Sequence, residues 1–211
     1  MHSIVVYSIA VAAALFVGTL QAQTPASGTL LVSTALTDRN FAESVVLMVH
    51  HDDDGSLGIL VNRPTNLRPV AVFPEEPTLQ KYDGELFLGG PVGPSQPLVL
   101  LRAPARGLIE GPPVVGDIYI SADLGLLGSF PTASVDSTQV RFYAGHAAWG
   151  AGQLAAEIAA GSWHVVSGRA DLVFSDEPLE LWRRVSRNDA ELVVAGDGRR
   201  SLPSSAGGNR R

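Results

Sequence analysis

Residues 141–163 read RFYAGHAAWGAGQLAAEIAAGSW, and this stretch decides the fold. It opens with an apolar, strand-like run that ends near Tyr143, and glycines between Gly145 and Gly152 then interrupt the strand pattern. Glycine adopts backbone angles that other residues avoid. The first half of the stretch therefore predicts a strand followed by a sharp, glycine-rich turn.

The second half of this stretch predicts an amphipathic helix that begins at Gln153. Leu154 and Ile158 recur at helical spacing, which places them on one apolar face. Gln153 and Glu157 are four residues apart and share another face of the same helix. Gly161 then supplies a stop signal for the helix.

The rest of the chain contributes mainly short strands. Two apolar runs, at 45–49 and 57–61, surround Asp54-Gly55, a dipeptide that tolerates the positive φ of tight hairpin turns. Further strands are predicted at 30–32, 86–88, 98–101, 118–120, 165–166 and 171–174, and a second helix through Pro178, Leu181 and Val185. Because strands outnumber helices and the hairpin is antiparallel, the predicted fold class is α+β rather than alternating α/β.

Composition favours a single domain. The chain has 211 residues, of which 45% are hydrophobic and 17% charged, so it can bury a sizeable core. The domain is predicted at 23–194, and the Gly-, Ser- and Arg-rich segment at 195–211 is predicted to be a disordered tail. The sequence contains no cysteine, which excludes disulfides, thiolate zinc sites and cysteine nucleophiles.

The N-terminus resembles a secretory signal peptide. Residues 4–20 are almost wholly apolar, and the small and polar residues around Ala22 suit signal-peptidase cleavage. We therefore predict a signal-like segment at 1–22, which makes the product periplasmic or secreted, without stable membrane insertion after cleavage. The start of the segment lacks Lys and Arg, so two alternative interpretations remain, a short membrane anchor and a start codon placed too early. If the segment is not a working signal, the protein is expected to be cytoplasmic.

The charge pattern disfavours direct nucleic-acid binding. The net charge is −6, and the tail from residue 195 carries +3, so the remaining chain carries −9. Nucleic-acid binders usually show the opposite, a concentrated basic patch. We predict no cofactor and expect a protein partner or a small ligand instead.

Four motifs carry a resemblance to a known family. They are Phe41-x-x-Ser44-Val45-Val46-Leu47, Gly58-x-x-x-Asn62-Arg63-Pro64, Gly89-Gly90-Pro91-Val92, and Tyr143-Ala144-Gly145-His146-Ala147-Ala148-Trp149-x-x-Gly152-Gln153-Leu154-x-x-Glu157-Ile158. Over roughly residues 28–187 the chain resembles the bacterial YqgE/AlgH family. The resemblance implies coiled, mostly antiparallel sheets that form a partly open barrel or sandwich with a few packed helices.

The same resemblance implies little about chemistry. The biochemical activity of the family is not established, and AlgH is described as a transcriptional regulator of alginate synthesis. Members ordinarily begin near the position of Gly28, without a signal-like segment, and are treated as cytoplasmic. A working signal at 1–22 would therefore mean that this member has been redirected.

Two chemical hypotheses are weaker than their structural alternatives. His50 and His51 precede three aspartates, but adjacent strand residues point to opposite faces, so a hairpin turn is favoured over a metal site. Ser44 and His146 form a conceivable nucleophile and base, but Ser44 lacks the Gly-x-Ser-x-Gly context. A serine that bonds neighbouring backbone is the favoured interpretation of Ser44.

The central stretch holds most of the candidate ligand-binding residues, which combine aromatic surface with hydrogen-bonding groups. The candidates are Asn62, Tyr143, His146, Trp149, Gln153 and Glu157. The competing interpretation is that these residues belong to the core or satisfy backbone groups. The predicted function is a non-catalytic regulatory or binding protein, and the alternative is a hydrolase-type enzyme with a site near His146.

Overall fold

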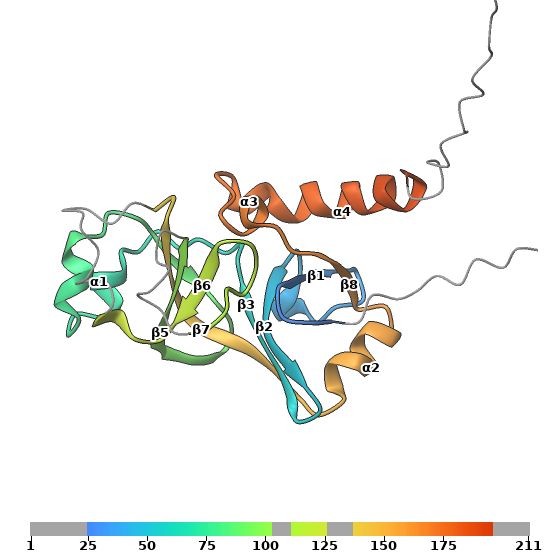
Figure 1. Cartoon of the computed structure of the whole chain (residues 1–211), viewed down its shortest axis with the longest axis horizontal. Coiled ribbons are helices and arrows are strands. Elements are labelled where there is room, and N and C mark those ends of the chain that lie inside the picture. The colour runs from blue at the N-terminus through green and yellow to red at the C-terminus, as the bar shows by residue number, and fades with distance from the viewer. Residues whose placement is uncertain (1–24, 103–110, 126–136, 196–211) are drawn as a thin grey trace, which may run out of the picture.

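The computed structural model describes residues 25–102, 111–125 and 137–195 (Figure 1). The predicted signal-like segment at 1–22 lies outside the described residues, as does the predicted tail apart from Ala195. Within the described part of the chain, no helix is both long enough and apolar enough to span a membrane.

Eight strands of the described residues form one sheet that does not close on itself. Its order is β6-β5-β7-β3-β2-β1-β8, and β4 pairs with β7 outside this order. The strands are β1 (Thr29–Ser33), β2 (Val45–Asp52), β3 (Gly55–Leu60), β4 (Leu86–Leu88), β5 (Val92–Arg102), β6 (Ile118–Ser121), β7 (Val140–Gly150) and β8 (Trp163–Ser167). The pairs are antiparallel except β4 with β7. This mostly antiparallel, open sheet confirms the predicted α+β class.

Strand β7 is longer than predicted because it passes through the glycine-rich segment without stopping. Its first half pairs with β4 and β5, and from Ala147 onward it pairs with β3. Gly145 lies at this change of partner with a φ of 72°. A Cβ there would lie 2.5 Å from the Gly90 carbonyl oxygen, so only glycine fits. The predicted turn at Gly145 is therefore wrong, and the chain turns only after Gly150.

The predicted hairpin between β2 and β3 is confirmed. Asp52 pairs with Gly55, so Asp53 and Asp54 form the turn. The pairing register shifts between Met48 and His50, opposite Leu57 and Gly58 in the middle of β3. The opposite edge of β3 pairs with β7, so the hairpin connects directly to the central strand.

Helices pack around the sheet in short pieces apart from one long C-terminal helix. They are the 3-10 helices η1 (Arg39–Phe41) and η2 (Pro77–Lys81), and the α-helices α1 (Pro69–Val72), α2 (Gln153–Ala159), α3 (Ala170–Val173) and α4 (Pro178–Ala195). The two predicted helices are confirmed as α2 and α4. The predicted strand at 171–174 is wrong, because most of that segment belongs to α3. Periodicity cannot separate a strand from a helix in so short an apolar run.

A buried arginine explains part of this helical turn. Arg141 on β7 is 7% exposed, and its guanidinium donates to the carbonyls of Val173 and Ser175, at 3.1 and 2.6 Å. It also lies over the rings of Phe87 and Phe174. These interactions satisfy backbone carbonyls at the end of α3 and just after it, and they fix that turn against the sheet.

Helix α4 covers the β1 and β8 end of the sheet (Figure 1). Its Leu181 and Val185 join the core cluster that contains Leu30 and Val32. The Trp182 indole also donates a 2.9 Å hydrogen bond to the carbonyl of Ser33. Burying two such aliphatic side chains stabilises the fold by roughly 1.5–3 kcal/mol each.

Candidate functional site

The carboxylate of Glu157 on α2 is held by three N–H donors. Oε2 accepts from the indole nitrogens of Trp149 at 2.9 Å and Trp163 at 2.8 Å, and Oε1 accepts from the Gln153 amide at 2.9 Å. The two indoles are 6% and 3% exposed, so their bonds to the charged oxygen are largely shielded from water. We call this arrangement the Glu157 clasp, because it joins α2 to the end of β7 and the start of β8.

The ends of α2 are fixed by backbone geometry. Gly152 precedes the helix in a left-handed conformation, with a φ of 71°. At the other end, the amide of Gly161 donates to the backbone carbonyl of Ile158, and the amide of Ser162 donates to the backbone carbonyl of Glu157, each at 2.9 Å. This pair of bonds is a Schellman motif, which satisfies the last carbonyls of a helix. The predicted glycine stop is therefore confirmed.

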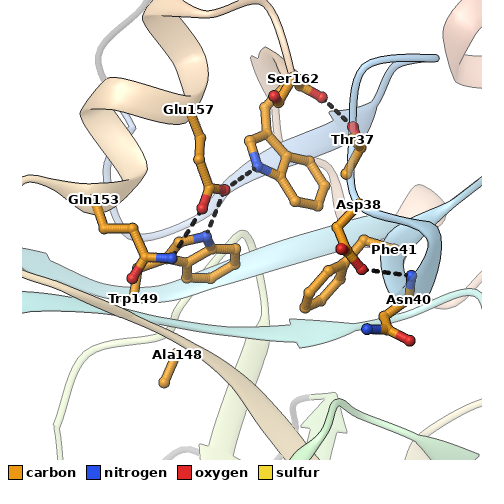
Figure 2. A pocket seen from close by; sticks show the side chains of 10 residues that line it. Thr37, Asp38, Asn40, Phe41, Ala148, Trp149, Gln153, Glu157 and Ser162 are labelled. Carbon is orange, nitrogen blue, oxygen red and sulfur yellow. Dashed lines mark hydrogen bonds between the residues drawn. The ribbon is translucent and has the colours of Figure 1, made fainter.

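A cavity of about 420 Å³ opens beside the clasp, and we call it the Glu157 cavity. Figure 2 shows Glu157 and Trp149 on one side and Phe41 with Asp38 on the other. The lining residues are Thr37, Asp38, Asn40, Phe41, Ala148, Trp149, Gln153, Glu157, Ser162 and Trp163. Two of them are carboxylates, and none of these described lining residues is Lys, Arg or His. The cavity is therefore both aromatic and acidic.

Two aromatic residues of this cavity were missed among the predicted site residues. Phe41 stacks on Trp149 at a centroid distance of 6.3 Å and meets Trp163 edge-on at 5.7 Å. The sequence contains a signal for each of these two residues, since Phe41 opens a family motif and Trp163 follows the helix stop. Their convergence depends on the pairing of β1 with β8, which the sequence does not reveal.

Asn62 holds the turn that carries Phe41. Its side chain accepts from the Val45 amide at 2.8 Å and donates to the Glu43 carbonyl at 2.9 Å. Glu43 has a φ of 52°, an unfavourable value for a residue with a side chain. Asn62 is 5% exposed, so it positions the cavity wall and does not line the cavity.

Arg63 strengthens the same turn. Its Nη2 donates to the Ala42 carbonyl and to Ser44 Oγ, both at 2.8 Å. Partial burial lowers the pKa of Arg63 below its ordinary value, but a guanidinium stays charged at neutral pH. Ser44 is fully buried, and its Oγ accepts from the Arg63 side chain, whereas the favoured interpretation expected a bond to neighbouring backbone.

Tyr143 belongs to the core and lines neither the Glu157 cavity nor the cleft that lies beside His146. It is 0% exposed, and its hydroxyl has no hydrogen-bond partner among the described residues. Burial raises the pKa of Tyr143 to about 12, although the nearby Arg141 guanidinium opposes this rise through its positive charge and its polar contact with the hydroxyl. The ring packs against Phe87 at 5.4 Å.

His146 lines a different space, which we call the His146 cleft. This cleft of about 680 Å³ is lined by Val49, Leu57, Ser95, Gln96, Pro97, Leu98, Ile120, Ser121, Ala122 and His146. Ser44 is not among these residues, so the structure does not bring the hypothetical nucleophile and base into one site. Of the six predicted site residues, only Trp149, Gln153 and Glu157 therefore meet around one cavity.

The histidines of the hairpin make separate polar contacts. His50 Nε2 lies 2.7 Å from Asp52 Oδ2, and His51 Nδ1 lies 2.7 Å from Ser56 Oγ. The Asp52 carboxylate also accepts from the amides of Asp54 and Gly55. The bond to His50 and these turn bonds lower the pKa of Asp52, and they agree with the favoured turn interpretation.

Comparison with known proteins decides the family. A model described as AlgH-like (DUF179) matches residues 29–190. The chain belongs to the AlgH-like family. A relative in Streptomyces avermitilis, described only as a UPF0301 protein, is 37% identical over 175 residues, which is 80% of this chain and 90% of that protein. A UPF0301 protein of Myxococcus xanthus is 35% identical and covers 82% of this chain and 97% of its own length.

Solved structures share the AlgH-like fold. A crystal structure of a Corynebacterium diphtheriae protein superposes with a TM-score of 0.66 at 24% identity, covering 80% of this chain and 90% of that one. The solution structure of AlgH from Pseudomonas aeruginosa gives 0.61 at 24% identity, with coverage of 84% and 95%. The resemblance drawn from the four motifs is confirmed, and three of those motifs supply or position residues of the Glu157 cavity.

Proposed function

We propose that this AlgH-like protein is a non-catalytic binding protein whose Glu157 cavity takes a small organic cation. The observation that carries the proposal is the combination of three aromatic rings with two carboxylates in a lining that includes no basic side chain among the described residues. Aromatic faces and carboxylates both attract ammonium groups, most strongly where water is partly excluded. A volume of about 420 Å³ suits a ligand of metabolite size.

The bonding of Glu157 favours binding over catalysis. A general base needs a free lone pair directed at the proton that it removes. Three protein N–H donors already occupy most of the roughly four lone-pair sites of the Glu157 carboxylate, which leaves it little capacity to take up a proton. The carboxylate thus contributes a fixed negative charge to the cavity, which is useful for recognition.

Titration calorimetry with choline tests the proposal. Its neutral comparison ligand is dimethylbutanol, in which a carbon replaces the ammonium nitrogen. We expect choline to bind at one site and dimethylbutanol to bind at least about tenfold more weakly, as expected for one charge-dependent contact. Equal affinities would reject a cation site.

Two charge variants locate the choline site. Asp38→Asn keeps the oxygen that caps the Asn40 amide but removes a carboxylate from the rim, so it should weaken choline binding several-fold. Asp53→Asn is the matched control, because it removes the same charge from the hairpin turn, and Asp53 is not part of the cavity lining. Equal effects of both variants would mean that only the net charge of the protein matters.

We propose that any regulatory role acts through a protein partner or the ligand and not through DNA contact. The −9 charge of the chain outside its tail supports this view, since duplex DNA repels an acidic surface. Tight duplex binding that weakens steeply with salt would contradict this proposal.

A separate proposal is that the segment at 1–22 directs export of the protein. N-terminal sequencing that finds a cytoplasmic product retaining Met1 would contradict export.

A further inference from the structure

The His146 cleft is shaped by an irregularity in β5. Val92 pairs with His146 while Pro97 pairs with Ala144, so the intervening residues of β5 bulge away from β7. A Cβ at Gly93 would lie 3.7 Å from His146 Cε1, which places the imidazole directly beside this bulge. Such bulges redirect strands and side chains and commonly occur next to functional sites.

Glycine contacts hold His146 at this position. A Cβ at Gly90 would lie 2.2 Å from the carbonyl carbon of His146, and the Gly90 oxygen closely approaches Gly145. The Gly89-Gly90-Pro91-Val92 motif therefore packs its backbone directly on the corner of β7. This packing fixes the backbone that carries the imidazole, which pre-organises the cleft.

The cleft has an apolar floor and a polar end. Val49, Leu98 and Ile120 come from three strands and pack on the main core while remaining partly exposed. The polar groups are His146, Gln96 and the serine hydroxyls. His146 makes no hydrogen bond within the described part of the chain, so its ring nitrogens are available to a ligand.

The geometry points to a second binding site, in which the His146 cleft takes a small amphiphilic carboxylate such as a medium-chain fatty acid. The alkyl chain would cover the apolar floor, and the carboxylate would accept hydrogen bonds from His146 and the Gln96 amide. No Asp, Glu, Lys or Arg occurs among the described residues of the lining, so nothing there repels an anion. This site is independent of the Glu157 cavity.

Calorimetry of the full chain with octanoate tests the site, with octanol as the neutral ligand of the same chain length. We expect saturable octanoate binding, and octanol binding at least about tenfold more weakly because it lacks charge-assisted hydrogen bonds. His146→Ala should weaken octanoate binding about tenfold while leaving octanol affinity unchanged. The control is His164→Ala, which changes an exposed histidine on β8 and should behave as the wild type.

Gln96→Glu provides a variant at an exposed position, where the fold is not at risk. It replaces an amide donor with a carboxylate of the same shape and should abolish octanoate binding while sparing octanol. Equal binding of octanoate and octanol, or octanoate affinity unchanged in both variants, would overturn the site. A dimer that Gln96→Glu dissociates without any octanoate would instead assign the cleft to a second copy of the chain.

Discussion

The Glu157 cavity and the His146 cleft are both built from β7, yet their central polar side chains are in opposite states. Glu157 is held by three N–H donors, whereas His146 has no hydrogen bond within the described residues. Both belong to one family motif. The difference shows that a single motif can contain one residue that fastens the structure and another that the structure leaves open to a ligand.

Gly145 separates the two regions, and its replacement should have the largest effect. Gly145→Ala should destabilise the protein by about 4 kcal/mol, because it adds left-handed strain and an overlap with fixed backbone oxygens. Gly152→Ala is the matched control, since Gly152 has nearly the same φ but nothing within 4 Å of an added Cβ. Urea unfolding should give about 1 kcal/mol for the control. Similar losses in both variants would refute the close packing at the corner.

Glu157→Ala should have the next largest effect. Removing the carboxylate leaves two largely buried indole N–H groups without their acceptor, which should cost about 3 kcal/mol. Glu180→Ala on α4 is the control, because this glutamate is half exposed and its ion pair within the described part of the chain is with Arg183 at the surface. Its loss should stay within about 1 kcal/mol in the same urea unfolding experiment. A small loss in Glu157→Ala would show that the clasp contributes no stability.

Tyr143→Phe should have a small effect that depends on pH. Among the described residues the hydroxyl has no well-formed hydrogen bond, although Arg141 lies near it, so its removal should be neutral or stabilising by up to about 1 kcal/mol at neutral pH. Burial raises the pKa of Tyr143 in the folded state to about 12, whereas its pKa in the unfolded state is roughly 10. The free energy of unfolding is therefore unaffected by ionisation of this group below about pH 10, and it falls as the pH rises from there through about 12, because the unfolded state loses the proton first.

The effect of Tyr143 is measured from how the free energy of unfolding changes at alkaline pH. Between about pH 9 and 11, the wild type should lose about 1 kcal/mol more of its free energy of unfolding than Tyr143→Phe does. Thermal unfolding at several pH values, extrapolated to one temperature, provides the comparison. Parallel pH profiles for the two proteins would contradict the raised pKa of this buried phenol.

His146→Ala should have the smallest effect on stability. The imidazole is only partly buried and forms no hydrogen bond among the described residues, so the change should stay within about 0.5 kcal/mol. Urea unfolding beside Glu157→Ala would then show the contrast between the two regions directly. A loss comparable to that of Glu157→Ala would mean that His146 is a structural residue.

Local signals in the sequence predicted much of the fold. The Asp54-Gly55 hairpin and helix α2 were predictable because turn chemistry and helical periodicity act over a few residues. The passage of β7 through Gly145 was not predictable, because it depends on the close approach of Gly90, which belongs to a distant segment of the sequence. The helical turn α3 was missed for a related reason, since the side chain that binds its end is Arg141 on β7.

The candidate site was predictable only in part. Trp149, Gln153 and Glu157 meet because a strand and the following helix place them together, which spacing indicates. Tyr143 and His146 lie on the same strand but point into the core and into another cleft. Asn62 acts at the turn before β2, a contact that requires knowledge of how β2 and β3 pair.

Nuclear magnetic resonance of the indole N–H groups tests the separation of the two sites most directly. The three tryptophans provide the probes, because Trp149 and Trp163 bind Glu157 while Trp182 binds the Ser33 carbonyl. Choline should shift the signals of Trp149 and Trp163 and leave Trp182 unchanged, and octanoate should leave all three unchanged. If choline moves none of them, or if both ligands move the same pair, the assignment of a cation to the Glu157 cavity and an anion to the His146 cleft is contradicted.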